Sequence, residues 1–492
     1  MLLIRGPRGL VLIFGVLILV TGYYYYLRLE PTKSLEKEVY ASLATSPHSS
    51  TPKYKPDVEA GPVSVTSSPE LSVSPSDILL IVKTGASTAW RRMPIQLVTT
   101  LSNFPNRVIY SDLQENLTPE IQTIDVISNV SDILRTHDTT AYEIYQDLHA
   151  NIRAYKEQAQ LPGDEPELPE GNKPGWFLDR YKFLPMLAHA QKNYPGFKWT
   201  VYIEDDTFVF WTNLLRWLAT LPVDDEPAYY GSFAGEGNET FAQGGSGVVF
   251  SRSLMASVFG GPKIPTLKEY ASFTADSCCG DITLGKVLRD HDVLVNRGEG
   301  GLMAFRPEPP WKTGFDGFMW CKPIFSSHRL HQKDLVELTM LERQHNQSNL
   351  GSRPFLFRDI FLAIIFPYID DRRSNWDNLA SRHILTENIT TLTDARWGPP
   401  APFVEDKVAL EQAYTSPKAC HAACVAVSYC RIWKHEVDNE EQKSCSLDTL
   451  VTLGRAIEGR RSWDKRVIES GWMMERIDNT LMADKCEVVV PP

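Results

Sequence analysis

The 492-residue sequence predicts a mixed α/β fold with a mostly parallel sheet, followed by a small cysteine-rich domain at the C-terminus. Two observations favour the sheet: apolar strand-like runs alternate with helix-like stretches, and several of these runs end at an acidic residue. A third observation separates the last part of the chain, because five of the eight cysteines lie after residue 419. A chain of this length is expected to form two or three domains.

The N-terminus carries an uncharged apolar run from Leu10 to Leu27, which as a helix would nearly span a bilayer. We expect an uncleaved transmembrane signal anchor at 10–27, a cytosolic tail at 1–9 and a lumenal remainder. A cleaved signal peptide is the alternative. Residues 28–76 are rich in Ser, Pro and Thr and predict an extended stem between the anchor and the folded part.

Cysteine usage and glycosylation sequons also favour a lumenal body. The crowded C-terminal cysteines predict a disulfide framework in an oxidising compartment. A zinc site is the alternative, although no Cys-x₂-Cys pair occurs. Asn-x-Ser/Thr sequons begin at five positions, Asn116, Asn129, Asn238, Asn346 and Asn388. The formal net charge is −11 without a long basic block, so we expect no nucleic-acid partner.

We expect the folded part of the chain to begin at Asp77. Residues 77–85 indicate a buried strand that ends in the polar turn Lys-Thr-Gly, with Thr84 and Gly85 last. A helix-like stretch follows, and residues 106–112 then indicate a second strand ending at Asp112. This strand–helix–strand order predicts parallel strands with ligands at their carboxyl ends.

The next elements repeat this alternation as far as a third strand. We expect helices at 140–160 and 177–194 with a loop between them, a strand within 199–211 and a short helix at 213–221. The run from Phe355 to Ile369 is strongly apolar but contains charged residues, which favours a buried core segment over a second membrane span.

Three consecutive acids, Glu204, Asp205 and Asp206, interrupt the apolar segment Trp199–Trp211. Carboxylates packed together repel one another unless a cation lies among them. Oxygen ligands of this kind suit Mg²⁺ or Mn²⁺. The alternative is a solvated acidic turn, but such a turn does not need a strand on each side.

Downstream, three further segments carry residues of interest. Gly244 and Gly245 belong to a glycine loop that permits close approach of the backbone to a ligand, or that forms a plain tight turn. Asp281 precedes a helix, where an acid is either a cap or a catalytic group. His328 and His331 follow an apolar strand, and one of them is a candidate metal ligand.

Together these segments resemble glycosyltransferase family 31, which includes the Fringe proteins and the core 1 β1,3-galactosyltransferases. The resemblance covers roughly residues 77–370 and implies the nucleotide-sugar-binding fold called GT-A. It rests on five elements in order, Val-Lys-Thr-Gly at 82–85, Glu-Asp-Asp at 204–206, Gly-Gly-Ser-Gly at 244–247, Asp-Ile-Thr-Leu-Gly at 281–285 and Ser-His at 327–328.

The resemblance implies a role for each matching residue. Asp206 corresponds to the acid that binds the metal carrying the UDP diphosphate, with Asp205 in support, and His328 completes the metal site. Glu204 departs from the usual Asp, which leaves its direct role open. Asp281 corresponds to the catalytic base. Six residues are then expected to line the nucleotide-sugar site, Thr84, Gly85, Asp112, Asp205, Gly244 and Gly245, and Asp205 is also expected among the metal ligands.

The implied activity is that of a metal-dependent inverting glycosyltransferase. It would move galactose, N-acetylglucosamine or a similar sugar from a UDP-sugar donor to a glycan or glycoprotein acceptor, in β1,3 linkage, with Mn²⁺ or Mg²⁺ as cofactor. Such an inverting transfer needs one carboxylate to accept the proton of the acceptor hydroxyl. Family members have the same membrane topology, which implies a single-pass type II protein of the Golgi or ER membrane.

Three alternatives remain open at this point. The chain could be a non-catalytic chaperone or scaffold with the same fold, or a carbohydrate-binding membrane protein. A retaining glycosidase would use two carboxylates that flank the scissile bond, but it needs no metal–diphosphate site. The donor sugar, the acceptor and the oligomeric state, for which a homodimer is one option, are not readable from the sequence.

We expect the glycosyltransferase domain to span 77–400, up to a proline-rich stretch at 397–402. The following residues, 403–492, resemble a PAN/apple-type module in their cysteine spacing and tryptophans. Such modules bind proteins or carbohydrate, and a disulfide-stapled structural cap is the alternative. Because five cysteines cannot all pair with one another, either one bridge joins the two parts or each part keeps a free thiol.

Overall fold

The structure is a computed structural model, and it describes residues 73–151, 174–222, 226–296, 303–348, 353–390, 392, 406–457 and 465–486. All of these belong to the compact unit Ser64–Pro492. The predicted anchor at 10–27 and almost all of the predicted stem lie outside the described residues. Among the helices that are described, none is both long and apolar enough to cross a membrane.

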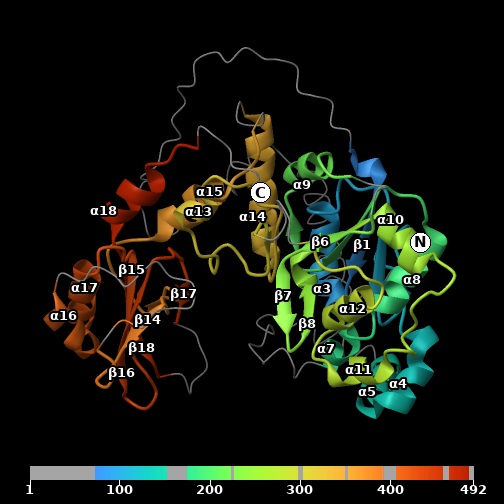
Figure 1. The fold of residues 1–492 in the computed structure, drawn as a ribbon, viewed down its shortest axis with the longest axis horizontal. Coiled ribbons are helices and arrows are strands. Elements are labelled where there is room, and N and C mark those ends of the chain that lie inside the picture. The colour runs from blue at the N-terminus through green and yellow to red at the C-terminus, as the bar shows by residue number, and fades with distance from the viewer. Residues whose placement is uncertain are drawn as a thin grey trace, which may run out of the picture. The chain divides into compact units, whose positions relative to one another are not determined.

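The larger sheet has six strands in the order β3-β2-β1-β4-β9-β6 (Figure 1). Neighbours from β3 to β4 are parallel, whereas β9 is antiparallel to both β4 and β6. The strands are β1 (Ile78–Lys83), β2 (Arg107–Ser111), β3 (Thr123–Asp125), β4 (Trp199–Glu204), β6 (Tyr229–Gly231) and β9 (Val248–Ser251). This mixed, mostly parallel sheet fits the predicted fold class.

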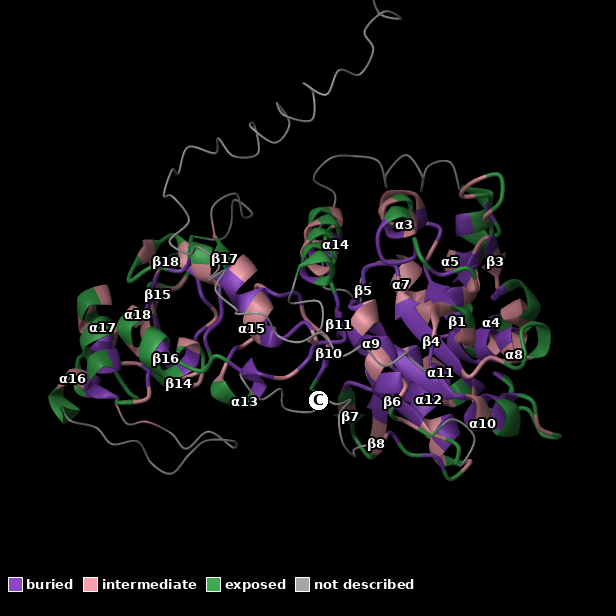
Figure 2. Cartoon of the chain, turned by 90° about the horizontal axis from the view of Figure 1, so that it is seen from above, coloured by how far each residue is buried: buried purple, intermediate pink, exposed green. Residues whose placement is uncertain are grey.

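Both faces of this sheet are buried, which is why its strands are continuous apolar runs. In β1, Leu79 and Ile81 belong to one core cluster, while Ile78, Leu80 and Val82 belong to the cluster on the opposite face. This alternation is the period of two that a strand imposes. Figure 2 shows the buried strands, with exposed outer faces on the surrounding helices.

The helices of this part follow the strands in the predicted alternation, and several differ from the predicted bounds by a few residues. They are α3 (Ala89–Val98), α4 (Ser131–His137), α5 (Thr139–Ala150), α7 (Pro174–Asp179), α8 (Phe183–Asn193), α9 (Trp211–Leu218), α10 (Arg252–Leu254), α11 (Ala271–Asp276), α12 (Gly280–Arg289) and α14 (Gln332–Gln347).

Two small sheets complete this part of the chain. A hairpin joins β7 (Phe233–Glu236) to β8 (Glu239–Ala242). The second sheet has the order β10-β11-β5 and brings together three two-residue strands, β5 (Phe208–Val209), β10 (Phe305–Arg306) and β11 (Ser326–Ser327). It is short, but it joins the segment after the acids to the segment before His328.

The C-terminal part is built on a five-stranded sheet in the order β12-β18-β15-β16-β14, whose pairs are all antiparallel. Its strands are β12 (Arg373–Ser374), β14 (His383–Leu385), β15 (Ile432–Val437), β16 (Lys443–Asp448) and β18 (Val467–Trp472). Because β12 and β14 precede residue 390, the sheet crosses the domain boundary predicted at 400–403. The position of the boundary stays a prediction.

Short helices and a second strand pair surround this sheet. The pair is β13 (Trp376–Asp377) with β17 (Arg455–Ala456), and the helices are α13 (Gly317–Trp320), α15 (Phe357–Ile360), α16 (Lys407–Glu411), α17 (Pro417–Ala426) and α18 (Met474–Ile477). The apolar run Phe355–Ile369 is largely buried core, as predicted, with Phe361 and Ile365 fully covered.

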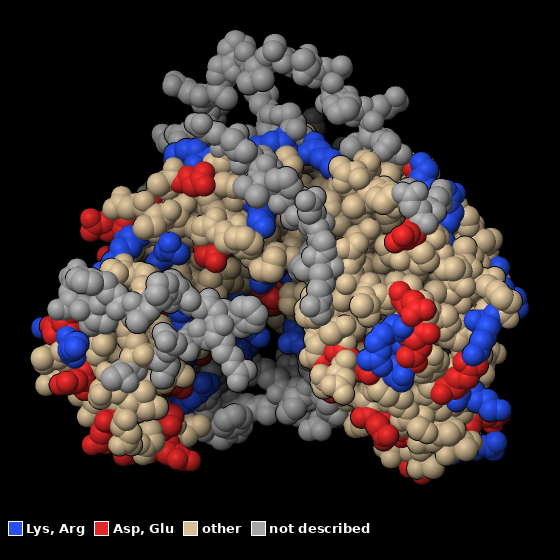
Figure 3. All heavy atoms as spheres, in the orientation of Figure 1, with Lys and Arg blue, Asp and Glu red and all other residues tan. Residues whose placement is uncertain are grey.

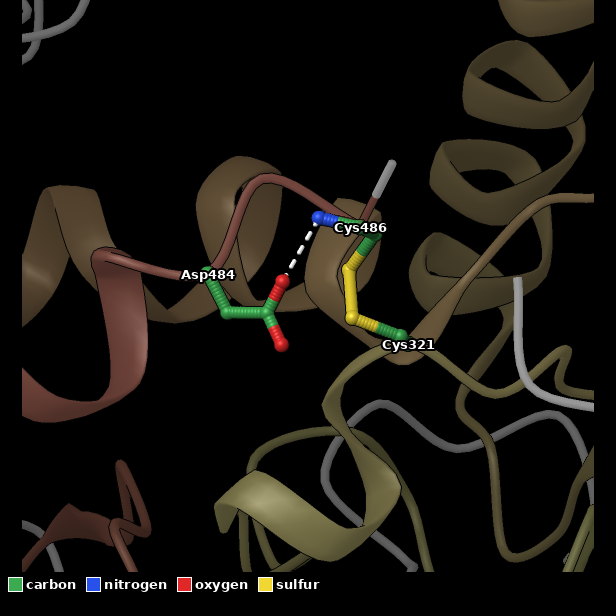
Figure 4. Close-up of side chains that lie close together, drawn as sticks. All are labelled: Cys321, Asp484 and Cys486. Carbon is green, nitrogen blue, oxygen red and sulfur yellow. Dashed lines mark hydrogen bonds between the residues drawn. A yellow bond between two sulfur atoms is a disulfide. The ribbon is translucent and has the colours of Figure 1, made fainter. Parts of the chain in front are cut away.

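All eight cysteines are paired. Two bridges, Cys420–Cys445 and Cys424–Cys430, lie within the C-terminal part, and Cys278 pairs with Cys279. The fourth, Cys321–Cys486, joins the end of α13 to the last described residue (Figure 4). Beside it the Asp484 carboxylate accepts a hydrogen bond from the Cys486 backbone N–H at 2.8 Å. A bridge between the two parts was one of the open alternatives.

Charges on the surface are mixed in sign. On the face shown in Figure 3, Asp and Glu side chains lie beside Lys and Arg side chains. Pairs such as Lys286–Asp290 and Arg289–Glu239 are partly exposed, and each contributes little because water screens it. The electrostatics that matter for function must therefore be sought among the buried charges.

Candidate functional site

The small sheet places Asp206 beside His328. Strand β4 ends at Glu204, and the chain turns through the two aspartates into β5. There Ser327 of β11 pairs with Phe208, so the residue after β11 is carried to the turn. The backbone N–H of Leu330 then donates to the carbonyl oxygen of Asp206 at 3.1 Å. A pairing of two short strands thus joins segments far apart in the chain.

Glu204, Asp206 and His328 offer ligand atoms that all lie within 4.8 Å of one another. The His328 Nε2 atom is 3.1 Å from Asp206 Oδ1 and 3.6 Å from Glu204 Oε2. Among the described residues, His328 Nδ1 is buried without a hydrogen-bond partner, while Asp206 Oδ1 faces the imidazole of His328. Buried polar atoms without a partner are rare and need an explanation. Two carboxylates and an imidazole form a donor set that fits Mn²⁺ or Mg²⁺.

Asp205 is held differently from its neighbours. Its carboxylate accepts hydrogen bonds from the Thr84 hydroxyl at 2.6 Å, the Thr88 hydroxyl at 2.9 Å and Arg92 Nη1 at 2.8 Å. Both oxygens are therefore engaged within the protein. The contacts of Asp205 fix the turn, and its predicted role as a metal ligand stays a prediction.

Glu204 belongs to a network in which Lys83 and Lys182 pair with three carboxylates. Lys83 Nζ lies 3.1 Å from Glu204 and 3.3 Å from Asp179. Lys182 Nζ lies 2.7 Å from Asp179 and 2.8 Å from Asp112. Burial alone would lower the pKa of each lysine, but the facing carboxylates outweigh it and raise the pKa of both, so both stay charged.

Asp112 and Gly85 shape the turn at the end of β1. Asp112 Oδ1 accepts from the Ala86 N–H at 2.8 Å, and its other oxygen pairs with Lys182. A β carbon at Gly85 would lie 3.3 Å from Asp112 Oδ2, which is tighter than an ordinary contact. Because Asp112 is only 1% exposed, its contact with the uridine or ribose stays a prediction, whereas its part in holding this turn is visible.

The Asp206–His328 pair is strongly ionised in the metal-free protein. Burial would raise the pKa of Asp206, but Arg92 and His328 outweigh it and lower this pKa to about 2. Burial would lower the pKa of His328, but Asp206 and Glu204 raise it to about 10. A cation that binds here would have to displace the imidazole proton.

The glycine loop connects this cluster to Asp281. Its residues form the 3-10 turn η4 (Gly244–Ser246). The Gly244 N–H donates to Asp281 Oδ2 at 2.8 Å, and the carbonyl oxygen of Gly245 accepts from the Thr207 hydroxyl at 2.6 Å. The loop is therefore bonded on one side to the candidate base and on the other to the residue after the acids.

Asp281 is the second residue of α12, but it does not cap that helix. The N-cap position is Cys279, and the Asp281 carboxylate instead accepts from Gly244 and from the Ile282 N–H at 3.0 Å. Burial raises the pKa of Asp281 to about 6, with Glu204 acting in the same direction. A carboxylate with such a pKa is ionised at neutral pH and is a stronger base than an exposed one.

The structure brings together most of the residues singled out from the sequence. Asp206, His328, Gly245 and Asp281 form one continuous site, while His331 is exposed at the start of α14. Sequence reasoning missed Lys83, Arg92, Asp179 and Lys182 as members of the charge network. Only Lys83 could have been noticed in the sequence, because it lies at the end of a strand that leads to the site. The carboxylates that face an Arg or Lys on a helix cannot be read from its position in the sequence.

Comparison with known families agrees with this geometry. Residues 73–295 match the family model described as Fringe-like. The match covers less than half of the chain and supports the resemblance of this segment to glycosyltransferase family 31. It contains the first four of the five resemblance elements, while Ser327-His328 lies beyond it. A search of the curated proteins gave no match.

Proposed function

We propose that the protein is a metal-dependent inverting glycosyltransferase of family 31, which transfers a sugar from a UDP-sugar to a glycan or glycoprotein acceptor. The observation that carries the proposal is the cluster of Asp206, Glu204 and His328 at the carboxyl end of β4, whose ligand atoms all lie within 4.8 Å of one another. The Fringe-like match over residues 73–295 supports it independently.

Asp206 and His328, with Glu204, would hold a divalent cation. When bound, the cation would stabilise the negative charge that develops on the leaving UDP diphosphate. Asp205 would support this site, with Thr84, Thr88 and Arg92 engaging its carboxylate.

Asp281 would act as the general base. Its carboxylate is fixed by two backbone N–H groups and is ionised at neutral pH, so it can accept the proton of the acceptor hydroxyl. One in-line displacement at the anomeric carbon then inverts its configuration. The bond between this carbon and the diphosphate oxygen breaks as the bond to the acceptor oxygen forms, and UDP leaves.

The finer assignments follow the resemblance. We propose a β1,3 linkage, a galactose or N-acetylglucosamine donor, Mn²⁺ as the preferred cation and a single-pass type II orientation in the Golgi or ER membrane. The cysteine-rich part, with its sheet from β12 to β18, is proposed to be a PAN/apple-like module that helps to bind the acceptor.

A panel of UDP-sugars tests the proposal with the full-length protein in detergent micelles. We expect release of UDP from at least one donor in the presence of Mn²⁺, and loss of release after chelation. Asp281→Asn should keep UDP binding and lose turnover, whereas Asp206→Asn should lose both. Absence of release from every donor, together with absence of UDP binding, would favour a non-catalytic scaffold instead.

A further inference from the structure

Helix α3 presents three polar side chains to the acidic turn. Thr88 at its N-cap, Arg92 and Gln96 are spaced four residues apart and therefore share one face of the helix. Thr88 and Arg92 bind the Asp205 carboxylate, and Gln96 Nε2 donates to the carbonyl oxygens of Asp205 and Thr207 at 3.0 and 2.9 Å. This face of α3 fixes the turn that carries the acids.

Arg92 also contacts the candidate metal ligand. Its Nη1 atom lies 2.8 Å from Asp205 Oδ1 and 3.1 Å from Asp206 Oδ2. The two aspartates differ in their other contacts, since the Thr84 and Thr88 hydroxyls donate to Asp205, while Asp206 Oδ1 faces the imidazole of His328 at 3.1 Å. The Arg92 guanidinium therefore contacts both Asp205, which the protein holds in place, and Asp206, which would bind a cation.

A bound cation and Arg92 would both face Asp206, in addition to the imidazole of His328. A cation that binds alone must share this carboxylate with a guanidinium whose Nη1 atom lies 3.1 Å from Asp206 Oδ2, and positive charges held by one carboxylate repel each other. A cation that arrives with a diphosphate brings negative oxygens, and a planar guanidinium binds phosphate oxygens well. The repulsion is then replaced by an attraction.

We propose that Arg92 is a positioning residue that couples cation binding to nucleotide binding at this site. It weakens the binding of a divalent cation by itself and strengthens its binding together with a nucleoside diphosphate. The inference rests on the proposed function, since it assumes that Asp206 is a ligand. By linkage the cation must raise the affinity for the nucleotide by the same factor.

The test measures free Mn²⁺ by electron paramagnetic resonance during titration of the full-length protein, with and without saturating UDP. For the wild type we expect UDP to raise the affinity for Mn²⁺ by about 5- to 150-fold, the usual range of coupling between sites. For Arg92→Gln we expect a higher affinity for Mn²⁺ alone, on the order of tenfold, and little further gain with UDP.

Arg135→Gln is the matched control, because it removes the same charge from an exposed pair with Asp132 on α4. It should behave as the wild type does. Arg92→Lys keeps the charge but loses the guanidinium plane, and it should show intermediate coupling. A thermal unfolding curve shows whether Arg92→Gln folds. If it does not, the coupling measured in Arg92→Lys tests the inference instead.

The outcomes separate this inference from the proposed function. Tighter binding of Mn²⁺ alone with lost coupling in Arg92→Gln supports the inference, and a damaged fold would not produce tighter binding. Unchanged coupling in a folded Arg92→Gln, or in Arg92→Lys if Gln is not tolerated, overturns the inference alone. If the wild type binds neither Mn²⁺ nor UDP, the proposed function and the inference both fail.

Discussion

Gly245 leaves the space that the imidazole of His328 occupies. A β carbon at Gly245 would lie 1.9 Å from His328 Cε1 and 2.3 Å from both ring nitrogens, far inside any tolerable contact. The glycine loop therefore has a packing reason for its second glycine, beyond the freedom of its backbone. His328 can face Asp206 only while position 245 carries no side chain.

Gly245→Ala should displace His328 and weaken binding of Mn²⁺, with UDP binding in the presence of Mn²⁺ reduced at least tenfold, in line with the loss of a metal ligand or its support. Calorimetric titration of UDP with Mn²⁺ measures this effect. Gly317→Ala is the control, because a β carbon at Gly317 meets nothing within 4 Å. Equal UDP affinity in both variants would show that His328 is not needed.

The pH dependence of turnover should report Asp281. Since the base must be ionised and its pKa is raised to about 6, the rate should rise roughly tenfold per pH unit below pH 6 and level off above it. Initial rates of UDP release across pH 4.5–8.5 provide the profile. A flat profile through pH 6, with the protein folded throughout, would contradict this assignment of the base.

The same group should affect stability with a defined sign. Folding raises the pKa of Asp281 from its ordinary value of 3.8 to about 6, so the folded protein favours the protonated carboxyl. This contribution to stability is therefore full below about pH 4 and is lost as the pH rises towards 6. Asp281→Asn does not titrate. The melting temperature of this variant relative to the wild type should therefore increase between pH 4 and pH 6.5, as thermal unfolding at several pH values would show.

Lys182→Met should destabilise the fold strongly. Lys182 is fully buried and binds Asp112, Asp179 and the carbonyl oxygen of Thr84, so its removal leaves a buried carboxylate without its cation. Breaking a buried ion pair in this way costs about 3–5 kcal/mol. Urea unfolding measures the loss.

Two further variants show whether the buried charge is the cause. Lys286→Met breaks a partly exposed pair with Asp290 and should cost less than about 1 kcal/mol. The double variant Lys182→Met/Asp112→Asn should recover part of the stability, because it removes the uncompensated acid as well. A double variant less stable than the single one would point to lost packing instead.

The long-range disulfide Cys321–Cys486 and the short-range disulfide Cys424–Cys430 should differ in their effect on stability. Cys321–Cys486 closes a sequence separation of 165 residues, and Cys424–Cys430 closes one of 6. From loop-closure entropy, replacing the first pair by serines should cost about 5 kcal/mol and the second about 2 kcal/mol. Melting temperatures of the two double-serine variants should follow this order, and the reverse order would mean that strain, not chain entropy, dominates.

The sequence predicted the strands β1 and β4 and the site at their ends because buried parallel strands are long apolar runs that finish at a polar residue. The family resemblance favoured His328 over His331, and the structure places the imidazole of His328 at Asp206. The strands follow from a local pattern, whereas the choice of histidine follows from the resemblance. The nearness of Glu204 to His328 could not be read from the sequence, since the direction of neighbouring side chains in a turn depends on contacts such as those of Asp205 with Thr84 and Thr88.

Long-range partners account for the remaining differences. Arg92 and Lys182 sit on helices whose spacing indicates a face but not the carboxylates opposite it. Strands β12 and β14 have two and three residues, which is too short for a period of two to be recognised, so the sequence did not indicate that these residues join the C-terminal sheet. The Cys321–Cys486 pairing depends on the fold of both parts. From the sequence, a bridge between the parts was one of two options, the other being a free thiol in each part.

The central claim is that Asp206 and His328 hold a divalent cation on which a nucleotide diphosphate binds. Calorimetric titration of UDP into the metal-free protein, before and after addition of Mn²⁺, tests it most directly. We expect binding that needs Mn²⁺ in the wild type and disappears in Asp206→Asn. UDP binding of equal strength with and without the metal, or unaltered by Asp206→Asn, would contradict the account.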